Sequence, residues 1–144
     1  MKRTLFALLL FSMGYFAHSL LDSTAHSNPN LTVKRYGWVI EVKPEMIEKY
    51  KRLHANPWPA VNAKLKDCNV RNYSIYLREI APGKHCLFSY LEYVGNDFDA
   101  DMAKMGADPE TQRWWKETDP CQKTIETAHD GEWWSTMEEV FHLD

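Results

Sequence analysis

The spacing of apolar residues predicts a strand and then a helix at the start of the folded region. From residue 34 to 42 every second position is apolar, which is the period of a strand, at Tyr36, Trp38, Ile40 and Val42. Pro44 suits the first turn of a helix, and apolar positions after it recur at steps of three and four. That helix face carries Met46, Ile47, Tyr50, Leu53 and His54. Pro57 and Pro59 should interrupt the helix, and residues 60–66 should continue it.

A β-hairpin should follow these helices. Residues 70–77 and 85–93 both have the composition of strands, and Pro82-Gly83 between them predicts the turn. The third strand is apolar on both sides, because one side presents Phe88 and Tyr90 and the other presents Leu87, Leu91 and Tyr93. A sheet of this kind is covered on both faces, and the helices of one copy can cover only one. We therefore expect a two-fold homodimer in which each subunit holds its own site.

Two short helices and a last strand complete the pattern. Residues 97–105 predict a helix capped by Asn96 or Asp97. A second helix should begin at Asp108-Pro109 and end at Asp119-Pro120. Residues 125–132 predict a loop, and residues 137–143 predict the final strand. Strand, helix, strand, strand, helices, strand is the order of an α+β, ferredoxin-like (split βαβ) sandwich, which pairs with a second copy as a dimeric α+β barrel.

The beginning of the chain differs from the rest. Residues 1–3 are a basic start, residues 4–17 are an apolar run, and small residues follow at Ala17 and Ser19 and again at Ser23 and Ala25. This is the pattern of a secretory signal peptide, and the run is short for a membrane span. We therefore expect a signal peptide and cleavage region over residues 1–25, a linker over 26–33 and one domain over 34–144. The protein would be exported, periplasmic or extracellular, and free of the membrane after cleavage, with an uncleaved anchor as the alternative.

Composition narrows the classes of function. The formal net charge of −3 gives no basic surface for nucleic acid. Cys68, Cys86 and Cys121 are odd in number and form neither a CxxC nor a CxxH motif, so neither a closed disulfide framework nor a zinc site is predicted. Six Trp and seven Tyr are many for a small core. Some of these aromatic side chains should line a pocket, where they suit a small polar ring such as a sugar.

His54 is the strongest candidate for proton transfer, because it shares a helix face with Tyr50 and lies just before the break at residues 57–59. A histidine satisfied in the core is the alternative. Trp114 and Trp115 point about 100° apart on a helix, so they cannot both face the same core. Either one packs and the other lines a cavity, or both lie at packing or dimer surfaces, and Trp133 and Trp134 pose the same question more weakly. Tyr73 either faces the helices or packs in the core. The acidic residues at 97, 99 and 101 lack the glycine and distal glutamate of a calcium loop.

Five short motifs occur in one order from about residue 34 to the C-terminus. They are Tyr50-Lys51-Arg52-Leu53-His54, Asn56-Pro57-Trp58-Pro59, Asn72-Tyr73-Ser74-Ile75-Tyr76-Leu77, Gln112-Arg113-Trp114-Trp115-Lys116 and Glu139-Val140-Phe141. Together they closely resemble the L-rhamnose mutarotase family. The resemblance implies a ferredoxin-like fold, a homodimer, and interconversion of the α and β anomers of L-rhamnose with neither a cofactor nor a metal.

The resemblance also implies roles for individual residues. His54 matches the family's proton donor, and four residues match its sugar contacts: Tyr50, Tyr73, Trp114 and Trp115. The partner base is left open. Two features depart from the family: Ala55 follows the histidine where the family has Asn, and the family is typically cytoplasmic whereas this chain has a leader. An exported member could act on rhamnose released from polysaccharide or on a related 6-deoxy sugar such as L-fucose.

Two other classes of protein are compatible with the sequence. An exported, non-catalytic sugar-binding module would keep Tyr73, Trp114 and Trp115 but would not need His54. A dimeric α+β-barrel monooxygenase or haem-binding protein would share the architecture, on fold analogy alone.

Overall fold

The structure is a computed structural model that describes residues 33–143. The predicted signal peptide and all of the predicted linker except Val33 lie outside the described residues. Within that range, no helix has the length and apolarity that crossing a bilayer requires.

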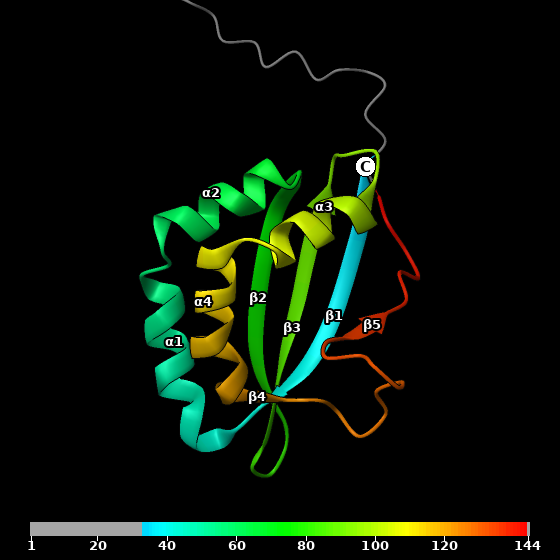
Figure 1. Cartoon of the computed structure of the whole chain (residues 1–144). Helices are drawn as coiled ribbons and strands as arrows, with labels where there is room; N and C mark the ends of the chain where they lie inside the picture. The colour runs from blue at the N-terminus through cyan, green and yellow to red at the C-terminus, as the bar shows by residue number, and fades with distance from the viewer. Residues whose placement is uncertain (1–32, 144) are drawn as a thin grey trace, which may run out of the picture.

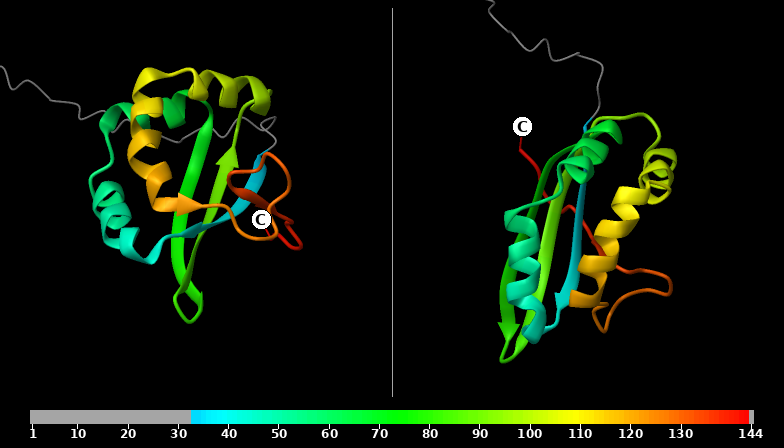
Figure 2. Two further views of the ribbon diagram at one scale, coloured as in Figure 1. Left: turned by 60° about the horizontal axis from the view of Figure 1, so that its bottom comes forward. Right: turned by 60° about the vertical axis from the view of Figure 1, so that its left-hand side comes forward.

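The described residues form a ferredoxin-like α+β domain (Figure 1). In chain order the elements are β1 (Lys34–Val42), η1 (Pro44–Met46), α1 (Ile47–Ala55), α2 (Pro59–Asp67), β2 (Val70–Ala81), β3 (Lys84–Tyr93), α3 (Phe98–Gly106), α4 (Pro109–Thr118), η2 (Asp119–Cys121), β4 (Gln122–Lys123) and β5 (Ser135–Met137). The sheet is antiparallel with the strand order β2-β3-β1-β4, and its helices lie together on one face (Figures 1 and 2). The predicted fold class is confirmed.

Proline and acidic caps set the helix boundaries. The helix that begins at Ile47 ends at Ala55, and α2 begins at Pro59, where a missing N–H costs nothing. The interruption predicted around residues 57–59 is therefore confirmed. Asp97 caps α3 by accepting a hydrogen bond from the Ala100 N–H at 3.0 Å. In the same way, Asp108 accepts from the Thr111 N–H at 2.9 Å and caps α4.

The predicted last strand over residues 137–143 is wrong in its position. β4 pairs with Glu41 and Val42, while β5 pairs with residues 37–39, so two short strands share the edge position beside β1. Residues 138–143 have no regular secondary structure and run back toward the end of the sheet where β1 begins (Figure 1). The apolar alternation that suggested a strand finds no layer to pack on in one subunit, because Val140, Phe141 and Leu143 are 87%, 78% and 79% exposed.

The core between the sheet and the helices consists of two buried clusters. One contains Ile40, Val42, Tyr50, Leu87 and Cys121. The other contains Cys68, Val70, Leu91, Tyr93 and Met105. Each large apolar side chain that is fully buried contributes about 1.5–3 kcal/mol. The three cysteines are buried and free. The two clusters are separate, and members of both line the cavity between them.

The opposite face of the sheet has no helix layer among the described residues (Figure 2). Val39, Phe88 and Tyr76 form a row across β1, β3 and β2 on this face. Phe88 is half-buried, whereas Tyr76 is exposed. Side chains on the helix side of the same strand, such as Leu87 and Leu91, are buried. The expectation of apolar residues on both faces is therefore confirmed.

Candidate functional site

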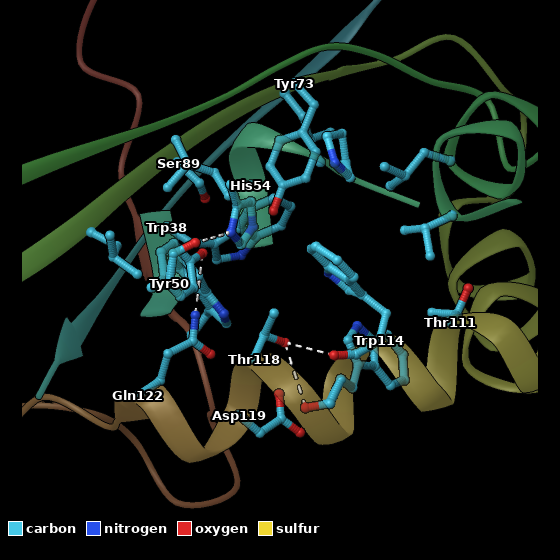
Figure 3. Close-up of a pocket in the computed structure, with 18 of the residues that line it drawn as sticks. Trp38, Tyr50, His54, Tyr73, Ser89, Thr111, Trp114, Thr118, Asp119 and Gln122 are labelled. Carbon is cyan, nitrogen blue, oxygen red and sulfur yellow. Dashed lines mark hydrogen bonds between the residues drawn. The ribbon is translucent and has the colours of Figure 1, made fainter. Parts of the chain in front are cut away.

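A cavity of about 880 Å³ lies between the sheet and the helices α1 and α4 (Figure 3). Its floor includes Trp38, Ser89 and Ile75, which pair in register across β1, β3 and β2. Tyr50 and His54 reach it from α1, and Trp114 and Thr118 reach it from α4. A volume of this size is near the upper end of the roughly 300–1,000 Å³ found for small-molecule sites.

His54 is held in one tautomer by its own helix. Its Nδ1 lies 3.0 Å from the Tyr50 carbonyl oxygen, which can only accept a hydrogen bond, so Nδ1 carries the proton. In the neutral ring the other nitrogen, Nε2, is therefore an acceptor that is directed away from that carbonyl. Burial is the main cause that lowers the pKa of His54, and the hydrogen bond to Tyr50 opposes it. The ring near neutral pH is thus a neutral base.

Tyr50 and Tyr73 bring two phenol groups to the same cavity. Burial raises the pKa of Tyr50 well above its usual range, and the nearby Tyr73 adds to this effect, while a hydrogen bond from Gln122 opposes it. The Gln122 Nε2 donates to the Tyr50 hydroxyl at 3.4 Å. Burial of the Tyr73 hydroxyl raises its pKa to about 12, and Figure 3 shows that hydroxyl directed into the cavity. Both phenols are therefore neutral and can donate or accept hydrogen bonds.

The two adjacent tryptophans occupy different environments, as their angular separation predicts. Trp114 is buried, and its ring and that of His54 meet in a T-shaped arrangement with a centroid distance of 5.3 Å. Trp58, from the break between α1 and α2, contacts Trp114 edge-on at 5.4 Å. Trp115 is exposed and lies beside Gly106 at the end of α3. Both border the cavity, so Trp114 is a fixed wall next to the histidine and Trp115 is part of the rim.

The structure brings together all five residues singled out in the sequence: Tyr50, His54, Tyr73, Trp114 and Trp115. Trp133 and Trp134, a second tryptophan pair in the sequence, also line the cavity. The structure adds residues that sequence reasoning missed, among them Trp38, Ser89, Thr118, Asp119 and Gln122. Ser89 had a signal, because it is the polar position within an otherwise apolar helix-facing row. Gln122 and Asp119 had no such signal, because Gln122 lies on a strand of two residues and Asp119 begins the short 3-10 helix η2. Burial raises the pKa of Asp119 above its usual range.

The acidic residues near α3 serve the fold. Asp97 is the cap of α3, and Asp101 accepts hydrogen bonds from the Tyr93 hydroxyl at 2.7 Å and from Asn69 at 2.8 Å. Across residues 33–143, no group of three or more His, Cys, Asp or Glu side chains is placed to hold a metal ion.

These features define a ferredoxin-like protein whose described residues form a cavity between the sheet and the helices, lined by a neutral histidine, two phenols and several indoles. The sequence pattern of the L-rhamnose mutarotase family matches residues 35–143, and the chain belongs to that family. The L-rhamnose mutarotase of Oceanobacillus iheyensis is 32% identical over 112 residues, which cover 78% of this chain and 100% of that protein. That of Bacillus subtilis is 35% identical over 117 residues, with coverages of 78% and 100%.

A solved structure shows the same fold. The crystal structure of L-rhamnose mutarotase from Formosa agariphila superposes with a TM-score of 0.57, covering 77% of this chain and 99% of that one. The sequences are 21% identical, so this likeness bears on the fold alone.

Proposed function

We propose that this protein is an L-rhamnose mutarotase, an isomerase that interconverts the α and β anomers of L-rhamnose. Family membership supports the reaction. The observation that carries the proposal is the state of His54: Nδ1 donates to the Tyr50 carbonyl, which leaves Nε2 free as a base in the wall of a cavity built for a small ring. A reaction that only moves a proton and opens a ring suits such a group.

In the proposed mechanism His54 acts first as a base and then as an acid. Its Nε2 takes the proton of the anomeric hydroxyl, the C1–O1 bond becomes a carbonyl, and the C1–ring oxygen bond breaks. The ring oxygen leaves with the electron pair and receives the proton from the imidazolium. Both oxygens are bonded to the same carbon, so one nitrogen can serve both in turn. The Tyr50 carbonyl stabilises the imidazolium through its bond to Nδ1–H.

Rotation about C1–C2 then presents the other face of the aldehyde, and the steps run in reverse to close the ring. Tyr50 and Tyr73 hold ring hydroxyls, because neutral phenols donate and accept. The faces of the cavity tryptophans pack on the apolar C–H face of the sugar. The family resemblance implies that His54 is a proton donor. In this mechanism it plays that role in the second step, when the imidazolium protonates the ring oxygen.

The residue after His54 bears on substrate choice. Ala55 is the last residue of α1 and lines the cavity, whereas Asn56, the C-cap that follows it with φ −134°, does not border the cavity. The amide that the family carries directly after its histidine is thus replaced here by a methyl group. We infer that the cavity is less polar at this point, which suits a 6-deoxy sugar and leaves L-fucose as the second substrate to test.

Exchange NMR tests the function directly. L-Rhamnose, L-fucose and a panel of common sugars are compared with and without the protein, against the spontaneous rate of each. We expect acceleration for L-rhamnose above all. If no sugar exceeds its spontaneous rate while some bind, the chain is a sugar-binding module and not an isomerase.

We propose that two copies pair through the face of the sheet that lacks helices. The row of Val39, Phe88 and Tyr76 and the exposed apolar side chains of residues 140–143 support this. A second copy would cover both. Light scattering should give twice the chain mass at micromolar concentration, and Phe88→Glu should reduce it to one chain mass. A monomer of the unaltered protein would contradict the proposal.

We also propose that residues 1–25 are removed during export. The basic start and apolar run of the sequence support this. The intact mass of the protein from its native host should correspond to a chain that begins between about residue 18 and residue 26. Soluble cytosolic protein that retains Met1 would contradict it.

A further inference from the structure

A second hollow adjoins the cavity at one shared residue. It has a volume of about 470 Å³ and lies where β1 and α3 begin. Trp38 lines both the hollow and the main cavity, so this indole is the boundary between them. A ligand larger than one sugar ring could therefore lie on both sides of Trp38. The family match and the proposed reaction account for the main cavity and leave this hollow unexplained.

The hollow contains an aromatic surface of fixed geometry. Tyr36 and Trp38 are neighbours on the same face of β1, with ring centroids 5.4 Å apart and planes only 4° from parallel. Phe98 packs on Tyr36 at 4.2 Å and holds it in place. These rings are half-buried, so part of their surface is open to a ligand. Flat, partly exposed aromatic surfaces suit the apolar C–H faces of sugar rings.

The polar groups around this surface favour a neutral ligand. Lys34, Asn96, Asp99 and Thr136 line the hollow, and they offer donors and acceptors of several kinds. The Asp97 carboxylate already accepts a hydrogen bond from the Ala100 N–H, so we do not count it among the ligand-binding groups. Its charge still counts: Lys34 is positive, whereas Asp97 and Asp99 are negative. The resulting net negative charge of the hollow disfavours anions such as phosphates and uronic acids. A neutral, hydroxyl-rich unit matches this set.

We propose that the hollow is a second sugar subsite, and that the protein acts on oligosaccharides with a 6-deoxyhexose at the reducing end. This inference rests on the proposed function, because it extends the substrate of the same site. Mutarotation requires a free hydroxyl at C1, so the reducing-end ring must lie at His54. The next ring must then be linked through another hydroxyl, such as that at C3 or C4, and it crosses Trp38 into the hollow.

The test compares L-rhamnose with a disaccharide that carries L-rhamnose at its reducing end, linked through O3 or O4. Anomer exchange by NMR gives kcat/KM for each, and we expect the disaccharide to be favoured. Lys34→Ala with Asp99→Ala removes two polar groups of the hollow and leaves the main cavity intact. This double variant should lower kcat/KM for the disaccharide about tenfold and leave that for L-rhamnose unchanged. Lys66→Ala with Asp130→Ala is the matched control, because neither residue lines the hollow or the cavity.

Binding of the methyl glycoside of the disaccharide separates the two proposals, because this compound cannot open its ring. Calorimetry should show that it binds more weakly to the Lys34 and Asp99 double variant than to the wild type. If the glycoside binds in this way but neither reducing sugar is accelerated, the subsite stands and the mutarotase function fails. If L-rhamnose is accelerated but the double variant affects both sugars equally, or the disaccharide is no better a substrate, the subsite proposal is overturned.

Discussion

The two sides of the cavity differ in how firmly their aromatic residues are held. On the inner side, Tyr50 and Trp114 are each 6% exposed and both contact His54. On the outer side, Tyr73, Trp115 and Trp133 are 43%, 38% and 43% exposed. Proton transfer needs fixed geometry, whereas a ring can be stacked by side chains with some freedom. We therefore propose that the inner residues keep His54 in a fixed geometry for proton transfer, and that the outer residues contribute mainly to sugar binding.

The sharpest test of this division is His54→Ala. Loss of the acid–base group should slow anomer exchange by about 100-fold or more, while sugar binding stays nearly unchanged. Exchange NMR measures the first quantity and calorimetry the second. His129→Ala, on the loop before β5 and outside the cavity, is the matched control. A folded His54→Ala protein that exchanges anomers at the wild-type rate would show that His54 only packs.

The pH dependence of kcat/KM tests which form of His54 reacts. Burial lowers its pKa below the usual 6.5, so the neutral base should dominate at neutral pH. Activity should be constant there and fall about tenfold per pH unit in acid, with a midpoint below 6.5. Activity that instead falls as the pH rises through 6 to 8 would mean that the imidazolium is the form that starts the reaction.

The inner and outer tryptophans should respond differently to truncation. Trp114→Ala empties a buried position and should lower the free energy of unfolding by about 3–5 kcal/mol. Trp115→Ala should leave stability nearly intact and weaken sugar binding by about 3- to 10-fold, through KM rather than kcat. Thermal unfolding and calorimetry on both variants measure these effects. Equal losses of stability in the two variants would contradict the proposed difference between the inner and the outer side of the cavity.

The parts of the fold that the sequence predicted are those set by local chemistry. Pro59 and the caps Asp97 and Asp108 act on their own helices, so the helix boundaries could be predicted. The edge beside β1 depends on pairing across the sheet, which places β5 at Ser135–Met137 rather than in the more apolar residues after it. The sequence of a short segment gives little indication of which distant strand it pairs with.

The candidate site shows the same limit. Tyr50 and His54 were predictable as neighbours because one helix face carries both. Their contact with Trp114 depends on tertiary structure. It could be expected from the resemblance to the family, which places all three residues at one site, but not from the periodicity of the sequence. Gln122 was not predictable, because it reaches the Tyr50 hydroxyl across 72 positions of sequence. Trp38 looked like an ordinary strand residue, and only the register with Ser89 places it on the cavity floor.

The smallest expected effect concerns Asp119, the strongest competitor of His54 for a proton-transfer role. It borders the cavity just after α4, as the first residue of η2, and burial raises its pKa, as a general acid or base would require. The proposed mechanism does not need it, because the two oxygens that exchange the proton are bonded to one carbon, so a single nitrogen of His54 can serve both in turn. Asp119→Asn keeps the shape of the side chain and removes its ionisation. Because the proposed mechanism takes no proton from Asp119, kcat/KM of this variant should stay within about threefold of the wild type, which is less than about 0.7 kcal/mol of transition-state free energy. A loss near 100-fold, with the acid limb of the pH profile also displaced, would instead make Asp119 the partner base and limit His54 to the donor step.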